Sequence, residues 1–208
     1  MPYYPLGSYV NTHKCRCIGR ASENSRYLFY VPFNSSKAES HEDVLVIMLN
    51  PSSSAKAHVF YNVPFANLED IDKTTNNVLN ILHRGINLSK VNTKFKSVTL
   101  LNLFPYFSPN QRDIDVIYGA SVSARARNEQ IIDQCLKKHT NGIVLVGWGK
   151  STTNGLSSAI YLNQIRIIKQ LLAKYSCKCY QYDSKISGFI PFNPSGKRCY
   201  VYHASSWR

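Results

Sequence analysis

The sequence is short of acidic residues. Its 208 residues include 12 aspartates and glutamates against 25 lysines and arginines, a formal net charge of +13. Self-repulsion of this size opposes a compact fold unless an anionic partner relieves it. The segment after Gln134 contains eleven basic residues, two before Gly149 and nine after it. Its one acidic residue is Asp183. We expect nucleic acid as the partner, although basic surfaces also occur without such a role.

Long apolar runs and a leader are also missing. The stretch Val44 to Leu49 is far too short to span a bilayer, and no basic-then-apolar segment opens the chain. No basic amphipathic helix with an aromatic face is visible either, which argues against a membrane surface. A chain of this length buries one good core. We therefore expect one domain, residues 1–208, that is a cytoplasmic monomer without a membrane partner.

Metal and phosphate-loop motifs are absent. The sequence has no Cys-x-x-Cys pair, no HExxH and no Walker spacing, so we expect no metal and no cofactor. The six cysteines include two Cys-x-Cys pairs, Cys15/Cys17 and Cys177/Cys179, and on a strand both thiols of such a pair share a face. A sulfur-ligated cluster that includes Cys199 stays open as the alternative to free thiols in a reducing compartment.

Apolar runs alternate with segments of helical periodicity. Strands are predicted at 27–33, 44–49, 97–104, 143–147 and 177–182, and helices at 69–84, 128–139 and 158–175. Such alternation favours a parallel sheet covered by helices. The predicted fold class is α/β, a three-layer α/β/α sandwich with a central, mostly parallel four-stranded sheet.

Polar or aromatic groups stand at the ends of three predicted buried strands. Asn50 follows the first, Asn102 the second, and Trp148-Gly149 the third. In open α/β sheets the ligand site lies outside the carboxyl ends of the strands. We therefore expect these groups to line one site.

Four motifs follow in order along the chain: LNPSSSA, TLLNLF, LVGWGK and PFNPSG, between residues 45 and 196. Each is weak alone, but the ordered set resembles the signature of the uracil-DNA glycosylase superfamily, α/β enzymes that cleave the bond between a base and its deoxyribose. The first motif is similar to the Asn-Pro-Gly version of the mismatch-specific and thymine-DNA glycosylase branches.

By this resemblance Asn50 would hold the attacking water. The small residue Ser52 stands where the uracil-specific branch carries a tyrosine against C5 of the base, so thymine or C5-substituted pyrimidines would not be excluded by size. Asn102 would read the polar edge of the flipped base. Phe65, with Phe60 as the second choice, would stack on that base, although either could be a core residue.

The last motif implies a second loop around the same nucleotide. The uracil-specific branch has His-Pro-Ser where this chain has Asn193-Pro-Ser. By the resemblance, Asn193 would support the leaving base. The implied DNA contacts come from both loops and their neighbours: Ser53, Ser54, Lys150, Ser195, Gly196, Lys197 and Arg198. Asp72 is a further candidate for catalysis, and the alternative for this carboxylate is a cap at a helix start.

The predicted activity is therefore a monofunctional DNA glycosylase. It would flip out a modified, mismatched or damaged pyrimidine and hydrolyse its N-glycosidic bond, and bulky phage bases such as hydroxymethyl or glucosylated cytosine would make it an anti-phage enzyme. Two alternatives stay open. One is a non-catalytic nucleic-acid-binding module, and the other is a hydrolase of free nucleotides or nucleosides.

Overall fold

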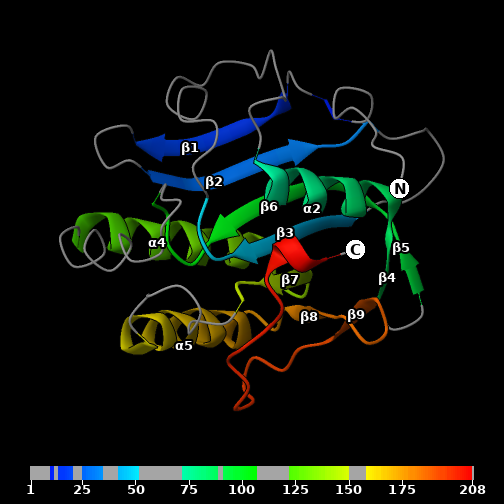
Figure 1. Cartoon of the computed structure of the whole chain (residues 1–208). Helices are drawn as coiled ribbons and strands as arrows, with labels where there is room; N and C mark the ends of the chain where they lie inside the picture. The colour runs from blue at the N-terminus through cyan, green and yellow to red at the C-terminus, as the bar shows by residue number, and fades with distance from the viewer. Residues whose placement is uncertain are drawn as a thin grey trace.

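A computed structural model of the chain describes residues 10–11, 14–20, 25–34, 42–51, 72–88, 91–106, 122–149 and 158–207. These residues form nine strands, three α-helices and one 3₁₀ helix (Figure 1). The strands are β1 (Arg16–Arg20), β2 (Ser25–Pro32), β3 (Glu42–Met48), β4 (Ile86–Leu88), β5 (Val91–Thr93), β6 (Phe95–Asn102), β7 (Ile143–Gly147), β8 (Lys178–Asp183) and β9 (Gly188–Pro191). The helices are α2 (Lys73–Arg84), α4 (Val122–Lys138), α5 (Ser158–Lys174) and η6 (Ala204–Ser206).

All nine strands belong to one mixed, strongly curled sheet of order β1-β2-β6-β3-β7-β8-β9-β4-β5. Strands β6, β3, β7 and β8 run parallel, whereas β1, β2, β9 and β5 each run antiparallel to a neighbour. The expected sandwich around a four-stranded, mostly parallel sheet is therefore wrong. The five predicted strands correspond to β2, β6, β3, β7 and β8, which form only the middle of a larger sheet, and the short strands β1, β9, β4 and β5 lie outside them.

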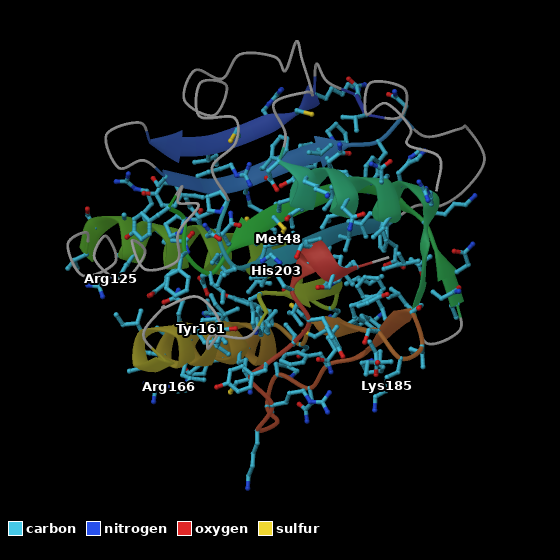
Figure 2. The ribbon with its side chains drawn as sticks, viewed as in Figure 1. Met48, Arg125, Tyr161, Arg166, Lys185 and His203 are labelled. Atoms are coloured by element: carbon cyan, nitrogen blue, oxygen red, sulfur yellow. The ribbon has the colours of Figure 1, made fainter. Side chains whose placement is uncertain are left out.

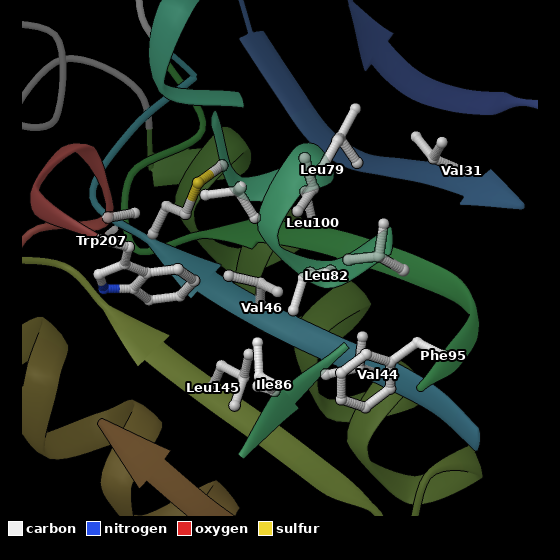
Figure 3. Packing of buried hydrophobic residues seen from close by; sticks show 14 of the residues in the cluster. Val31, Val44, Val46, Leu79, Leu82, Ile86, Phe95, Leu100, Leu145 and Trp207 are labelled. Atoms are coloured by element: carbon white, nitrogen blue, oxygen red, sulfur yellow. The ribbon is translucent and has the colours of Figure 1, made fainter. Parts of the chain in front are cut away.

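The centre of the sheet is buried on both faces. In β3 every residue from Val44 to Met48 is buried, as a continuous apolar strand requires. The first face, which includes Val44 and Val46, packs against α2 and Trp207 (Figure 3). The second face packs against α4 and α5, which contribute Ile132 and Ile165 among others.

The carboxyl-terminal residues close the first face. The Trp207 ring covers Gly147, where an added Cβ would lie 2.7 Å from the ring atom Cζ2. Asn77 on α2 donates a hydrogen bond to the Trp207 carbonyl at 2.8 Å. Gly147 is thus required by the close approach of Trp207, which joins α2 to the end of β7.

No described helix combines the length and the apolar composition needed to cross a membrane.

Candidate functional site

The candidate site lies at the carboxyl ends of β3, β6 and β7. Met48, the last residue of β3, pairs with Asn102 of β6 on one side and with Gly147 of β7 on the other. The helix after β3 packs on one face of the sheet and the helix after β7 on the other. Adjacent strands whose connections leave in opposite directions open a crevice at this edge, the usual ligand position in such sheets.

Asn50 and Asn102 are brought together here, as predicted. Asn50 is partly buried and stands two residues beyond β3. Asn102 is completely buried, and neither its amide nitrogen nor its amide oxygen has a hydrogen-bond partner within the described residues. A buried amide without partners loses its water and gains nothing in return. Such a group points to a ligand that completes its hydrogen bonds.

Asn128 holds the backbone beside Asn102 in place. This buried residue of α4 donates from Nδ2 to the carbonyl oxygens of Asn102 and Leu103, at 3.0 and 3.1 Å. Leu103 in turn donates its N–H to Met48 O at 2.8 Å, so the chain after β6 still follows β3. Sequence reasoning missed Asn128, because an asparagine inside a helix gives no signal of what its side chain contacts.

His203 completes this edge and was also missed by sequence reasoning. Its ring packs over Gly149, where an added Cβ would meet His203 Cβ at 3.1 Å, and Gly149 has a φ of +84°. His203 caps η6: its Nδ1 accepts the Ser205 N–H at 3.2 Å and lies 2.7 Å from Ser205 Oγ. Figure 2 shows His203 at the same end of the central strands as Met48.

The protonation of His203 follows from its surroundings. Burial lowers the pKa of His203, and the negative charge of Asp72 acts weakly in the opposite direction. The ring is therefore neutral near pH 7. Because Nδ1 accepts a backbone N–H, the single ring proton is on Nε2. A neutral imidazole with its proton on Nε2 can donate a hydrogen bond to an oxygen that gains negative charge.

Asp72 caps α2. One carboxylate oxygen accepts the Thr75 N–H at 2.9 Å, and the other accepts from the Thr75 hydroxyl at 2.7 Å. This is the capping alternative of the sequence analysis. The charge of Asp72 still reaches this edge, because it favours the protonated forms of His203 and of the buried Arg26.

Asn193 is not part of this edge, and its expected convergence with Asn50 is wrong. Strand β9 runs antiparallel to β8 and ends with Pro191 opposite Tyr180, which is level with Val46 in β3. Asn193 follows Pro191 by two residues, and because β9 is antiparallel to β8 this displaces it toward the amino ends of the parallel strands. Asn50 follows Val46 by four residues, which displaces it toward their carboxyl ends. Six residue steps separate the two by about 20 Å along the strands, too far to contact one nucleotide.

The side chain of Asn193 is used within its own turn. Its Oδ1 accepts the Ser195 N–H at 2.9 Å, and its carbonyl accepts the Gly196 N–H at 3.1 Å. The two copies of Asn-Pro-Ser in the sequence therefore belong to separate parts of the structure. One copy follows β3, and the other forms an Asx turn at the opposite end of the sheet.

Ser195, Gly196, Lys197 and Arg198 belong to this second turn and not to a loop beside Asn50. The buried Lys169 of α5 holds them, because its ammonium group donates to the carbonyls of Gly196 at 2.5 Å and Arg198 at 2.9 Å. The Lys197 and Arg198 side chains remain exposed. The remaining predicted site residues lie outside the described residues: Ser52, Ser53, Ser54, Phe60, Phe65 and Lys150.

The two Cys-x-Cys pairs lie in different parts of the core. Cys15 and Cys17 pack in the cluster on the α2 face, and Cys177 and Cys179 pack in the cluster on the α4 and α5 face. The pairs therefore cannot ligate one cluster. Burial raises the pKa of Cys15 and of Cys179 to about 12, so both stay protonated near pH 7. Within the described ranges, no three histidine, cysteine or acidic side chains are grouped to hold a metal ion.

Comparison with known proteins gives one family. No curated protein and no solved structure matches the chain. A family model described as protein of unknown function, DUF1643, matches residues 26–194, which include β3 through β9, all of β2 except Ser25, and the Asn50 and Asn102 strand ends. The chain therefore belongs to the DUF1643 family.

Proposed function

We propose that the protein is a DNA glycosylase that hydrolyses the N-glycosidic bond of a modified, mismatched or damaged pyrimidine and leaves an abasic site. The observation that supports this is the gathering of three groups at one sheet edge. Asn50 follows β3, the unpartnered amide of Asn102 ends β6, and the neutral ring of His203 covers the end of β7.

Asn50 has the role of orienting water in this proposal. Its amide oxygen accepts a hydrogen bond from the water that attacks C1′ of the deoxyribose. The new bond to C1′ forms as the bond from C1′ to the base nitrogen breaks, and the electron pair leaves with the base. The water proton passes to solvent. Because C1′ gains oxocarbenium character early, water placement matters more than a strong base.

Asn102 reads the base. Its carboxamide offers one acceptor and a two-proton donor, which match the alternating donors and acceptors on a pyrimidine edge. An extruded base that enters this crevice would satisfy both groups, which the described residues leave without partners. The unmet hydrogen bonds of Asn102 therefore favour a ligand with a planar polar edge.

His203 takes the role first expected of Asn193. A hydrogen bond from Nε2 to a base oxygen stabilises the negative charge that builds as the glycosidic bond breaks. The proposal thus no longer depends on two converging asparagine loops.

The substrate class follows from charge and from the sequence around Asn50. A net charge of +13 suits a polyanion such as DNA. We keep the expectation of a cytoplasmic monomer from the sequence analysis. By the family resemblance, the small Ser52 would not exclude C5-substituted pyrimidines by size, including the hydroxymethyl and glucosylated cytosines of phage DNA. An anti-phage role is part of this proposal.

The test is base release from a panel of oligonucleotides that carry uracil, mismatched thymine, hydroxymethylcytosine or glucosylated hydroxymethylcytosine. Released bases are identified by mass spectrometry, and abasic sites are counted by alkaline strand cleavage. Asn50→Ala should lower the rate at least about 100-fold, as the loss of an oriented reactant does. Asn193→Ala is the matched control, with the same change at the other end of the sheet, and should retain the wild-type rate.

Two results would overturn the proposal. One is that the wild-type protein releases no base from any DNA of the panel although it binds the DNA, which is the behaviour of a non-catalytic binding module. The other is equal hydrolysis of a free mononucleotide and of the same nucleotide within a strand, which would make the protein a nucleotide hydrolase.

A further inference from the structure

Residues 198–203, which we name the strap, present three large side chains to solvent. Arg198, Tyr200 and Tyr202 are exposed, whereas Val201 is buried. Arg198, Tyr200 and Tyr202 also line one cavity together, so their side chains are presented to the same space.

Both ends of the strap are fixed. Near its start Lys169 binds the Arg198 carbonyl, and Trp148 donates from Nε1 to the Cys199 carbonyl at 2.9 Å. At its end His203 packs over Gly149. The strap therefore leads from α5 to the candidate site. Its last residue, His203, is part of the strap and of the candidate site.

The two exposed tyrosines are held rigidly from behind. The Tyr200 ring stacks on Tyr161 with 6.4 Å between ring centroids and 12° between planes, and 41% of Tyr200 remains exposed. Tyr202 packs edge-on against Tyr182 at 6.2 Å, accepts a hydrogen bond from Ser184 Oγ at 2.9 Å, and is 43% exposed. Rings that are already ordered lose little entropy when another ring stacks on them.

A cavity of about 420 Å³ lies between the strap and strands β8 and β9. Its lining includes Tyr182, Tyr200 and Tyr202 together with Arg198, Asp183 and His203. This volume is typical of pockets that hold a small ligand. Because His203 lines it, the cavity adjoins the candidate site.

The cavity lining has one cationic residue, Arg198, and one acidic residue, Asp183, and further lysines follow nearby in the sequence. After Asp183 the sequence has no further acidic residue, whereas Lys185, Lys197 and Arg198 are all exposed. Figure 2 shows Lys185 near β8 and β9, far from Arg166, which lies on α5. Exposed rings combined with positive charge are the pattern of surfaces that bind unpaired nucleic acid.

We infer that the strap binds unpaired DNA nucleotides that flank the nucleotide in the candidate site, with bases on Tyr200 and Tyr202 and a phosphate on Arg198. This inference depends on the proposed function for the identity of the strand. A duplex keeps its bases stacked on one another and offers only phosphates and groove edges, so it would leave the tyrosine faces unused. The protein is thus a reader of single-stranded or locally opened DNA.

The test is fluorescence anisotropy with a labelled unmodified 12-nucleotide strand and with the duplex of the same sequence, at several salt concentrations. Tyr200→Ala and Tyr202→Ala should each weaken binding to the single strand about 5- to 150-fold, the range found for loss of one stacked base. Tyr200→Phe keeps the ring and should bind like the wild type. Arg198→Ala should reduce the salt dependence, whereas the matched change Arg166→Ala should not.

The inference is overturned if the folded alanine variants bind the single strand like the wild type, or if the wild type prefers the duplex. Circular dichroism checks the fold, and the phenylalanine variant separates loss of the ring from loss of structure. Because binding to an unmodified strand needs no base release, the result is independent of the proposed chemistry. Tight single-strand binding without any released base would reject the glycosylase and leave the strap as a binding site.

Discussion

Replacement of Asn102 by leucine should make the protein more stable and inactive. The Asn102 amide is fully buried, and neither polar atom has a partner within the described residues. Leaving such a group without hydrogen bonds costs about 1–3 kcal/mol, and leucine has nearly the same shape without the polar atoms. The free energy of unfolding should therefore rise by about 1–3 kcal/mol for Asn102→Leu. Under the proposed function, base release should also be lost, because Asn102 is the group proposed to read the base.

The matched control is Asn128→Leu, the same change at a neighbouring buried asparagine. Asn128 donates to two backbone carbonyls, and its replacement by leucine removes both of these buried hydrogen bonds. This variant should be destabilised by about 1–3 kcal/mol. Urea unfolding and thermal melts measure both effects, and in a chain of this size each kcal/mol moves Tm by about 2–4 °C.

The result that would refute this reasoning is a loss of stability of more than about 1 kcal/mol in Asn102→Leu. Such a loss would mean that the folded protein satisfies the Asn102 amide internally. Asn102 would then be a structural residue, and the base-reading role would have to be abandoned. Opposite signs for the two variants are the expected outcome.

Three further predictions concern the same edge. Burial lowers the pKa of His203 below 6.5, and protonation of Nδ1 removes the hydrogen bond from the Ser205 N–H that holds the ring in place, so base release should fall as the pH drops through that lowered pKa. His203→Gln should lose this acid limb together with most activity. Because the unfolded state takes up the proton first, stability should also fall below about pH 6.5. Asp72→Ala should cost about 0.5–2 kcal/mol as a lost cap, while Asp72→Ser should keep both stability and base release if capping is its whole role. Gly149→Ala should cost about 1–2 kcal/mol and reduce base release, because φ is +84° and the new Cβ would push against His203.

The elements with strong periodicity could be predicted from the sequence. The apolar runs at 44–49 and 143–147 correspond to β3 and β7, and the helix predicted at 158–175 corresponds to α5. The edge strands could not be predicted. Strand β4 is INL and β5 is VNT, three residues each, and such short segments have no periodicity that separates them from loops.

The candidate site could be predicted only where strand ends deliver its residues. Asn50 and Asn102 follow buried strands directly, so parallel pairing brings them together. Asn193 was misplaced because its motif does not indicate the direction of the strand before it. Asn193 follows β9, which runs antiparallel to β8. His203 was missed because its segment reaches the edge through Lys169, Trp148 and Gly149, contacts that leave no pattern in the sequence.

The packing of Trp207 also determines when the candidate site can form during synthesis. The Trp207 ring covers Gly147, and the Trp207 backbone carbonyl accepts a hydrogen bond from Asn77. Gly147 and Asn77 therefore gain these contacts only after residue 207 has been synthesised. A ribosome delivers residues in order, and the nascent chain therefore exposes the apolar surface over β7 until residue 207 emerges. His203 reaches Gly149 in the same step. This edge of the sheet is thus completed only after all nine strands of the described sheet have been synthesised.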